Sequence, residues 1–457
     1  MEELLKETLE RSLRYLRSLS ERSVAPTPEA VGRLKGLRGP LPETPSRSED
    51  VLSLLDDLGS PATVVNAGGR FFGFVNGGSL PVTVAANWLA TAWDQNAGQV
   101  VSSPVAAALE EIALEWLVDV LSLPAGTGGG FVTGATMANF SALAAARHAL
   151  LQRCGWDVEA EGLFGAPELR VVVGEEVHVS LLNALSLLGL GRERVLKIPV
   201  DDQGRMVASE LPELTDRTIL CLQAGNVNTG AFDPAKELCA KANDAGAWVH
   251  VDGAFGLWAA ASPNRAHLVA GHNGADSWAT DAHKWLNVPY DSGLVFCRDP
   301  ELLAAAMRQR AAYLAHHEVG RQPDHFVPEM SRRARGVEVW AALRALGRGG
   351  LAEMIERTCT HAARFAEGLQ AAGYNVLNDV ELNQVLVSFG DPDITNRVIE
   401  GVQQDGTCWC GGTLWQGHTA MRISVSSWAT SDEDVERSLD AILRIAERCR
   451  RSEKGRT

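Results

Sequence analysis

The segment AWVHVDGAFG, residues 247–256, is a short and continuously apolar run that ends in an acid and a glycine turn. Comparable runs stand before and after it, with helical stretches between them, at residues 170–174, 195–200, 218–223, 277–280 and 293–297. A strand that is covered on both faces shows such unbroken apolarity, whereas a half-exposed strand alternates. The pattern therefore predicts an α/β fold with a large, mainly parallel sheet, in which ligands gather at the carboxyl ends of the strands.

The N-terminal part of the chain is predicted to be a helical arm and not an independent domain. Apolar residues recur there at helical spacing among charged ones, at Leu5, Leu9, Leu13 and Leu16. Prolines at positions 26, 28, 40, 42 and 45 then interrupt the pattern. Because an apolar stripe of this kind has to lie against another surface, residues 1–68 are expected to form an arm.

The C-terminal part of the chain loses the regular alternation of strands and helices. A long helical pattern follows Trp340, and it is succeeded by the runs VLVSF at 385–389 and MRISV at 421–425 and by an amphipathic final helix. Mixed elements without alternation favour a small α+β domain. The sequence thus predicts a large α/β domain over residues 69–340 and a smaller α+β domain over residues 341–457.

Composition limits the partners and the compartment. The chain has 457 residues, and its 42 Lys and Arg against 57 Asp and Glu give a net charge of −15, which repels nucleic acid. Arg332, Arg333 and Arg335 form a local basic cluster. The sequence contains no run of roughly 18 apolar residues that could span a membrane, and the acidic N-terminus does not resemble a signal peptide. Eight cysteines without paired spacing suggest neither disulfides nor a metal site, so a cytoplasmic location is expected.

Two chemically informative residues stand at the ends of neighbouring predicted strands. Lys284, in TDAHKWLN at residues 280–287, follows a strand, and Asp252 ends the strand AWVHVD. Alone, the lysine could be a surface residue and the aspartate a helix cap. Together they are what a pyridoxal phosphate site requires: an amine for the Schiff base and a carboxylate that keeps the pyridine nitrogen protonated.

Two further segments agree with such a site. Residues 128–134, GGGFVTG, are predicted to form a glycine-rich turn before a helix, where backbone N–H groups and the helix dipole favour a phosphate. A glycine-rich turn is equally often plain turn chemistry. His178 follows the strand at residues 170–174, and its imidazole could lie flat on a cofactor ring, although a lone histidine there is more often structural.

In this order the four segments resemble the group II pyridoxal-phosphate amino-acid decarboxylases, which include the aromatic-L-amino-acid, histidine and glutamate decarboxylases. The resemblance covers nearly the whole chain, from RFFGF at residues 70–74 to MRISV at residues 421–425. It implies the type I aminotransferase fold, with a seven-stranded and mainly parallel sheet in the large domain. It also implies pyridoxal 5′-phosphate as the cofactor and a homodimer whose arm wraps the partner.

The resemblance implies roles for individual residues as well. Lys284 would form the Schiff base with His283 beside it, and Asp252 would partner the pyridinium. Ala254 would pack under the ring and His178 above it. The other cofactor contacts that it implies are Gly134, Ala135, Thr136, Asn226 and Asp281. Family members often carry Asn at the position of Asp281, where an anion beside a phosphate is unfavourable unless it is bridged or protonated.

Tyr313 bears on the type of reaction. It stands in AAYLAHH, residues 311–317, and matches a Tyr-Leu-x-His segment of the family. In that family the phenol protonates the substrate's α-carbon after carbon dioxide has left. Without the resemblance, a tyrosine packed on a helix face would be the simpler interpretation.

The expected substrate is an L-amino acid with an aromatic or large apolar side chain. Phe71, Phe72 and Phe74 occupy the stretch where aromatic decarboxylases build an apolar pocket, and only Arg70 stands nearby to receive a side-chain carboxylate. Most buried phenylalanines, however, only fill a core. Arg422 matches an arginine at which enzymes of this fold often bind the α-carboxylate, and it could equally be structural.

Three other functions remain possible at this point. A carbon–carbon lyase related to sphingosine-phosphate lyase shares the Asp-x-His-Lys pattern of residues 281–284 but lacks the Tyr-Leu-x-His segment. An aminotransferase uses the same cofactor chemistry. An inactive homologue could serve as a binding subunit, although Lys284, Asp252, His178 and Tyr313 are all present.

Overall fold

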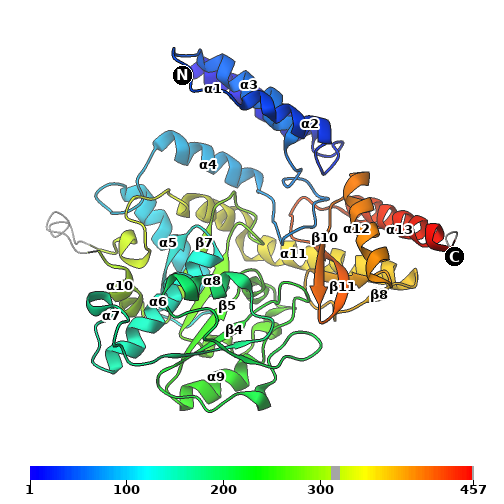
Figure 1. Ribbon diagram of the computed structural model, residues 1–457. Coiled ribbons are helices and arrows are strands. Elements are labelled where there is room, and N and C mark those ends of the chain that lie inside the picture. Colours follow the sequence, from blue (N-terminus) through cyan, green and yellow to red (C-terminus); the bar gives the residue numbers. More distant parts are fainter. Residues whose placement is uncertain (310–319, 455–457) are drawn as a thin grey trace. The chain divides into compact units, whose positions relative to one another are not determined.

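The computed structural model describes residues 1–309 and 320–454 (Figure 1). The chain forms two compact units. The large unit contains Gly77–Ala362 and Asn378–Gln384, and the terminal unit contains Met1–Asn76, Ala363–Leu377 and Val385–Thr457. The predicted division into residues 1–68, 69–340 and 341–457 stays a prediction.

The large unit is built on a seven-stranded sheet with the strand order β1-β7-β6-β5-β4-β2-β3. Strands β2 to β6 run parallel to one another, and β7 runs antiparallel to both β6 and β1. This arrangement confirms the predicted large and mainly parallel sheet. The strands are β1 Gly128–Val132, β2 Arg170–Gly174, β3 Leu196–Ile198, β4 Thr218–Gln223, β5 Trp248–Asp252, β6 Ser277–Asp281 and β7 Gly293–Cys297.

The register of the central strands brings the expected functional residues to one edge. Asp252, the last residue of β5, lies opposite Gln223 of β4 and opposite Ala279 of β6. Every residue of β4, β5, β6 and β7 is buried, which explains why their sequences lack a polar alternation. The carboxyl ends of β5 and β6 are therefore neighbours, as the sequence predicted.

Helix α6, Ala135–Arg153, covers the centre of this sheet and packs across β5, β6 and β7. Its buried face is rich in alanine, so the helix can approach the strands closely, and it forms a core cluster with α8, α10 and the sheet. The other helices of the unit are α4 Pro81–Trp93, α5 Pro104–Val120, α7 Val158–Glu161, α8 Val179–Leu187, α9 Ala235–Asp244 and α10 Pro300–Met307. Segment α11, Gly336–Ala371, consists of two helices joined by non-helical backbone at Gly347, and its residues from Ala363 on belong to the terminal unit.

The glycine-rich segment at residues 128–134 differs from its prediction, because most of it is a strand and not a turn. Gly128–Val132 form β1, and only the last two residues turn into α6. A Cβ atom at Gly128 would lie 2.5 Å from the Cβ of Pro300, and one at Gly129 would lie 2.3 Å from the carbonyl oxygen of Val295. The glycines are therefore needed because neighbouring chain segments pack against β1.

The terminal unit contains a second, smaller sheet with the order β10-β11-β9-β8. Its strands are β8 Asn375–Val376, β9 Gln384–Ser388, β10 Gly411–Trp415 and β11 His418–Ser424. Its helices are α1 Glu2–Ser18, α2 Pro28–Arg33, α3 Ser48–Gly59, α12 Pro392–Asp405 and α13 Asp432–Lys454. The sheet and its helices agree with the expected C-terminal α+β region, although β8 and β10 were not predicted. Helix α1 has no buried residue, so its leucine stripe is exposed in the protomer.

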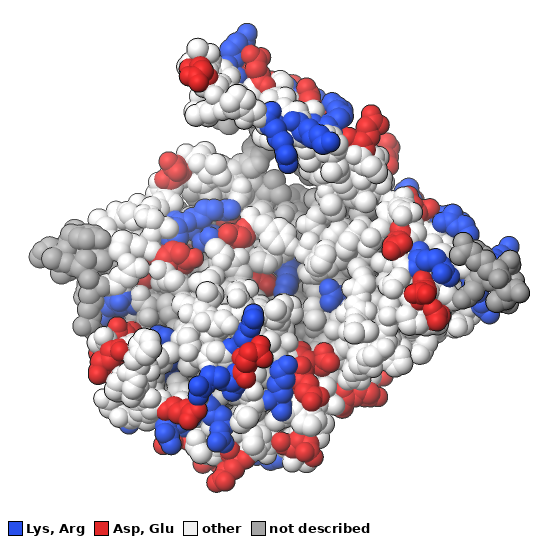
Figure 2. All heavy atoms as spheres, in the orientation of Figure 1, with Lys and Arg blue, Asp and Glu red and all other residues white. Residues whose placement is uncertain are grey.

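Charges of both signs are interspersed over the face of the molecule shown in Figure 2. The basic cluster noted in the sequence is engaged in ion pairs: Arg332, Arg333 and Arg335 pair with Glu110, Glu338 and Asp291, respectively. Within residues 1–309 and 320–454, no helix combines the length and apolarity needed to cross a membrane.

Candidate functional site

Lys284 lies just beyond β6, in the turn that follows the strand. Its Nζ atom is 3.0 Å from Oδ2 of Asp281, the last residue of that strand. The other carboxylate oxygen of Asp281 accepts a hydrogen bond of 2.6 Å from the backbone N–H of Ala135, the first residue of α6. Asp281 is 2% exposed, so a buried carboxylate links the lysine to the N-terminus of a helix.

Asp252 ends β5, and both of its carboxylate oxygens accept hydrogen bonds. Oδ1 accepts from the backbone N–H of Ala254 at 3.2 Å, and Oδ2 accepts from the side-chain amide of Asn139 at 3.0 Å. Two N–H donors stabilise the ionised form of a carboxylate over the protonated form. The geometry is therefore that of a buried carboxylate held as an anion.

His178 follows β2 and caps the N-terminus of α8. Its Nδ1 accepts the backbone N–H of Ser180 at 3.2 Å and lies 2.7 Å from the hydroxyl of the same serine. An Nδ1 atom that accepts a backbone N–H leaves the ring proton of a neutral imidazole on Nε2. The contacts to Ser180 thus fix both the tautomer and the orientation of the ring.

One cavity of the large unit joins these residues. Its lining contains the predicted residues His178, Asp252, Ala254 and Lys284, together with Gln223, Gly225, Val227 and Phe255. A nucleophilic amine, a carboxylate and an imidazole therefore converge on the same space at the carboxyl ends of β4, β5 and β6. The structure brings the core of the predicted site together.

The start of α6 forms a second corner of this site. Gly134 caps the helix without a side chain, and Gly134, Ala135 and Thr136 lead into its first turn. A Cβ at Gly134 would lie 3.2 Å from the ring of His283, and one at Gly293 would lie 2.5 Å from the Cα of Gly134. Gly293 is therefore required by the close approach of the Gly134 backbone, and a side chain at Gly134 would need His283 to shift by a few tenths of an ångström.

His283 completes this corner. Its Nδ1 accepts the backbone N–H of Ser292 at 3.0 Å, so Nε2 carries the proton of the neutral ring, 3.6 Å from Asp281. Burial lowers the pKa of His283, and the Asp281 carboxylate opposes this shift. The ring of Tyr290 packs on the imidazole with 4.5 Å between the ring centroids.

Asn226 follows β4 and is almost fully buried. Its Oδ1 accepts the backbone N–H groups of Asn228 and Thr229. Its Nδ2 has no hydrogen-bond partner among the described residues. A buried amide donor without a partner is costly unless a ligand or water satisfies it.

The remaining predicted residues belong elsewhere. Phe71, Phe72, Phe74 and Arg422 are part of the terminal unit. There Phe71 stacks on Trp409, Phe72 is buried against Phe365, and Phe74 is 62% exposed. Burial lowers the pKa of Arg422. Tyr313 lies outside the described residues.

The sequence interpretation missed the side chains that hold Asp252. Asn139 lies on α6 and His250 two residues before Asp252 on β5, and the two are hydrogen-bonded at 2.9 Å. The spacing of His250 and Asp252 in HVD places both side chains on one face of the strand, a signal that was available. Nothing local to Asn139 marks it, because its partners are more than a hundred residues away.

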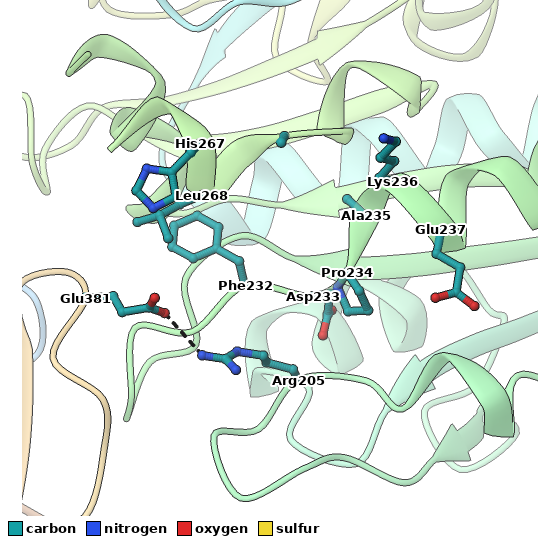
Figure 3. Close-up of a pocket in the computed structure, with 11 residues that line it drawn as sticks. Arg205, Phe232, Asp233, Pro234, Ala235, Lys236, Glu237, His267, Leu268 and Glu381 are labelled. Carbon is teal, nitrogen blue, oxygen red and sulfur yellow. Dashed lines mark hydrogen bonds and ion pairs between the residues drawn. The ribbon is translucent and has the colours of Figure 1, made fainter. Parts of the chain in front are cut away.

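A larger hollow of about 630 Å³ opens elsewhere on the large unit, and it contains none of the predicted site residues (Figure 3). Arg205 and Glu381 form an ion pair of 3.1 Å there, near Lys236 and His267. Charges of both signs line it, so it offers no concentrated field for an ionic ligand. Within the described part of the chain, no group of His, Cys, Asp and Glu side chains has the arrangement of a metal site.

Comparisons with known proteins agree with this geometry. Residues 38–390 match the family model described as the pyridoxal-dependent decarboxylase conserved domain. The aromatic-L-amino-acid decarboxylase of Bacillus atrophaeus is 31% identical over 66% of this chain and 62% of its own length. Tryptophan decarboxylase 1 of Oryza sativa subsp. japonica is 27% identical over 82% of this chain and 79% of its own.

Solved structures show the same fold. The crystal structure of Oryza sativa TDC with PLP and tryptamine has a TM-score of 0.90 at 23% identity and covers 98% of this chain and 97% of its own. Mouse CSAD has a TM-score of 0.88 at 22% identity, with 97% and 98% covered. The large sheet, the helices on it and the second sheet are therefore those of the predicted type I aminotransferase fold.

The residues of the site also fit the cofactor of this family. In the cavity, Lys284 offers an amine and Asp252 an anion for a ring nitrogen. Asn226 does not line this cavity, although its buried Nδ2 lacks a partner among the described residues. The start of α6 offers a helix dipole to a phosphate. The chain therefore belongs to the pyridoxal-dependent decarboxylases, carboxy-lyases whose cofactor is pyridoxal 5′-phosphate.

Proposed function

We propose that this enzyme removes carbon dioxide from an L-amino acid with an aromatic or large apolar side chain and releases the corresponding amine. The observation that carries the proposal is the single cavity lined by Lys284, Asp252 and His178. The similar proteins named as aromatic-L-amino-acid and tryptophan decarboxylases support the aromatic substrate class.

Arg70 gives a second argument for the substrate class. It is the one arginine beside the Phe71–Phe74 segment, and its guanidinium donates to the backbone carbonyls of Thr407, Ser20 and Arg22. Its Nε lies 3.5 Å from Asp434. A guanidinium with these partners is committed to the fold of the terminal unit. It is therefore a poor receptor for the side-chain carboxylate of glutamate or aspartate.

When bound, pyridoxal phosphate supplies an electron-withdrawing ring that stabilises the charge left on the α-carbon as carbon dioxide departs. In our proposal Lys284 holds the cofactor covalently. Asp252, an anion with two N–H donors, holds a proton at the ring nitrogen. His178, fixed by Ser180, would cover one face of the ring, and Ala254 would contact the other.

The phosphate is assigned to the start of α6. Gly134, Ala135 and Thr136 offer the helix N-terminus, and the Nε2–H of His283 points to the same corner through its contact with Asp281. Asn226, in the loop after β4, is proposed as a further contact of the cofactor through its Nδ2. Asp281 competes with a phosphate for these groups, which makes it the most informative residue of this corner.

Tyr313 is proposed, from the sequence alone, to deliver the proton to the substrate's α-carbon. Tyr313→Phe should then change the product ratio, with more aldehyde and ammonia under air, while cofactor binding persists. Products of both enzymes are compared under air and under argon, with Tyr374→Phe, a tyrosine packed on Phe389, as the control. Amine as the sole product at an unchanged rate would reduce Tyr313 to a packing residue.

A cytoplasmic homodimer completes the proposal. In the protomer, helix α4 exposes Trp88, Leu89 and Trp93, each by more than 40%, and α1 exposes its leucine stripe. Apolar faces of this size are stabilised when a second copy covers them. Sedimentation analysis should show a dimer, and a stable, active monomer would contradict this part of the proposal.

The substrate class is tested by incubating the loaded enzyme with each of the twenty common L-amino acids and measuring amine and carbon dioxide. We expect equal amounts of both products from aromatic amino acids. Preferred turnover of glutamate or aspartate would overturn the substrate class. Keto acid without carbon dioxide would indicate an aminotransferase. A protein that stays colourless with pyridoxal phosphate and turns over no amino acid would indicate a binding subunit. The family match favours the decarboxylase over these alternatives and over a carbon–carbon lyase.

A further inference from the structure

A chain of hydrogen bonds runs from the interior of the large unit to Asp252. The indole N–H of Trp248 lies 2.9 Å from the hydroxyl of Ser277, which lies 3.0 Å from Nδ1 of His250. Nε2 of His250 is 2.9 Å from Oδ1 of Asn139, whose Nδ2 donates to Asp252 at 3.0 Å. His250, Asn139 and Ser277 are completely buried.

One direction satisfies every bond in this chain. The indole N–H of Trp248 can only donate, so the hydroxyl of Ser277 accepts from it and can donate its own proton to Nδ1 of His250. The ring proton of His250 then sits on Nε2 and is donated to Oδ1 of Asn139. The amide therefore presents its N–H to Asp252. Burial lowers the pKa of His250 to about 4, so the ring is neutral, as this pattern requires.

The far end of the chain demands the same arrangement. If the amide of Asn139 were turned over, its oxygen would face the carboxylate of Asp252, and its N–H would face the N–H of His250. Both contacts are repulsive, and in a buried site no water relieves them. With its proton on Nε2, His250 thus holds Asn139 in the orientation that presents a donor to Asp252.

We propose that Asn139 and His250 are positioning residues that keep Asp252 ionised and aimed at the ring nitrogen of the cofactor. This inference rests on the proposed role of Asp252. The N–H of Asn139 at Oδ2 favours the ionised form of Asp252 over the protonated form, because a donor stabilises the anion. The pair therefore biases the shared proton toward the ring nitrogen. Neither residue lines the cavity, so both act through Asp252.

The elements that carry the pair explain why it stays rigid. His250 and Ser277 are register partners on the neighbouring strands β5 and β6. Asn139 enters from α6, which packs across both strands. A polar chain in an apolar interior is stable only when all members are satisfied, and here each has its partner. Removing one member should disturb Asp252 without opening the site.

The test uses the enzyme loaded with pyridoxal phosphate that carries ¹⁵N at the ring nitrogen. In the wild type, the ¹⁵N chemical shift should report a protonated ring across pH 6 to 9. In Asn139→Leu it should move toward the value of a neutral pyridine within that range. The turnover number should fall at least about tenfold with little change in KM, because a hydrogen bond to a charged group is lost.

Ser141→Ala is the matched control. Ser141 is also buried on α6, but its hydroxyl donates only to the carbonyl of Met137 in the same helix. Ser141→Ala should therefore leave the ¹⁵N chemical shift of the ring nitrogen unchanged. His250→Leu should shift the signal in the same direction as Asn139→Leu, and the double variant should add nothing further. If Asn139→Leu does not fold, Asn139→Ala and His250→Leu carry the same comparison.

An Asp252→Asn arm separates the two ideas. If Asp252→Asn loses the protonated signal and the Asn139 variants keep it at every pH, the positioning role is wrong while the role of Asp252 stands. If Asp252→Asn itself keeps the protonated ring, the proposed role of Asp252 is wrong, and the inference falls with it.

Discussion

The two corners of the site are organised in opposite ways. We call the surroundings of Asp252 the ring corner and the surroundings of Asp281 and the start of α6 the phosphate corner. In the ring corner, Asp252 accepts two N–H groups, from Asn139 and Ala254. In the phosphate corner, Asp281 accepts the N–H of Ala135 and pairs with the amine of Lys284. In the proposed function, the cofactor uses both of these groups. On that assignment the ring corner needs no rearrangement, whereas Asp281 would have to give up contacts that the cofactor takes over.

This difference assigns affinity and chemistry to separate residues. The ring corner should govern turnover, because its carboxylate acts on the charge that develops as carbon dioxide leaves. The phosphate corner should govern how tightly the cofactor binds, because a buried anion there opposes a second anion. Substitutions in the two corners should therefore affect different measurements.

Lys284 belongs to both corners, and its loss should have the largest effect. In Lys284→Ala the amine is absent, so borohydride should trap no cofactor on the protein, and turnover should disappear. Peptide mapping after reduction of the wild type checks the assignment. Recovery of pyridoxyl-lysine at any other position would refute it. Lys241→Ala, which removes an exposed lysine paired with Glu237, is the control.

Asp252→Asn should separate chemistry from binding. The cofactor should remain bound, since the phosphate corner is unchanged, while turnover falls on the order of a hundredfold or more because an amide cannot stabilise the ring cation. Cofactor content and steady-state rates measured on the same preparation check this. Near-normal turnover in folded Asp252→Asn would show that the ring corner does not govern turnover. The proposed separation of turnover from cofactor binding would then be wrong.

Asp281→Asn should have the opposite effect. Removing the anion while keeping an oxygen that can accept from Ala135 should tighten pyridoxal phosphate binding by about tenfold. The same substitution should increase the affinity for pyridoxal, which lacks the phosphate, much less. Equilibrium titration of the cofactor-free protein measures both. Asp276→Asn is the control, because Asp276 is also an acid beside β6 but accepts from Val249. Unchanged or weaker binding of the phosphate form would show that Asp281 does not compete with it.

The sequence predicted residues of both corners, and it located the ends of strands more directly than the contacts that a docked helix makes. Asp252 and Lys284 stand at the ends of strands that are buried on both faces, so their apolar runs reveal where the chain presents its ligands. The contact of Asp281 with Ala135 joins positions 146 residues apart. No local pattern encodes such a contact, because it depends on how α6 docks on the sheet.

The errors of prediction have the same origin. β1 was taken for a turn because three glycines stand in a row, and the packing of Pro300 and Val295 against them became visible only in the fold. Strand β8 contains only two residues and β10 begins with two glycines, so neither carries an apolar signal. The role of Asn139 was missed because a buried asparagine is defined by its partners and not by its neighbours in sequence.

The smallest effect that we expect is on stability. It concerns whether the interior of the large unit keeps its buried histidines neutral. Burial lowers the pKa values of both His250 and His272 to about 4. An unfolded histidine binds its proton near pH 6.5. Between pH 6.5 and 4 these histidines are therefore protonated in the unfolded chain but remain neutral in the folded chain. The free energy of unfolding that these residues contribute should fall as the pH is lowered through this window.

A variant isolates one of the two histidines. Buried acids act in the opposite direction, since burial raises the pKa of Asp233 to about 6 and the folded chain then takes up a proton first. Comparing the wild type with His272→Leu cancels the contributions of these acids, because both proteins contain them. His272 packs edge-on against Phe232 and lies outside the cavity of the site. As the pH is lowered from 6.5 to 4.5, the wild type should lose up to about 1.4 kcal/mol per pH unit relative to the variant. Urea unfolding at several pH values measures the difference, and parallel curves would mean that His272 titrates normally in the folded protein.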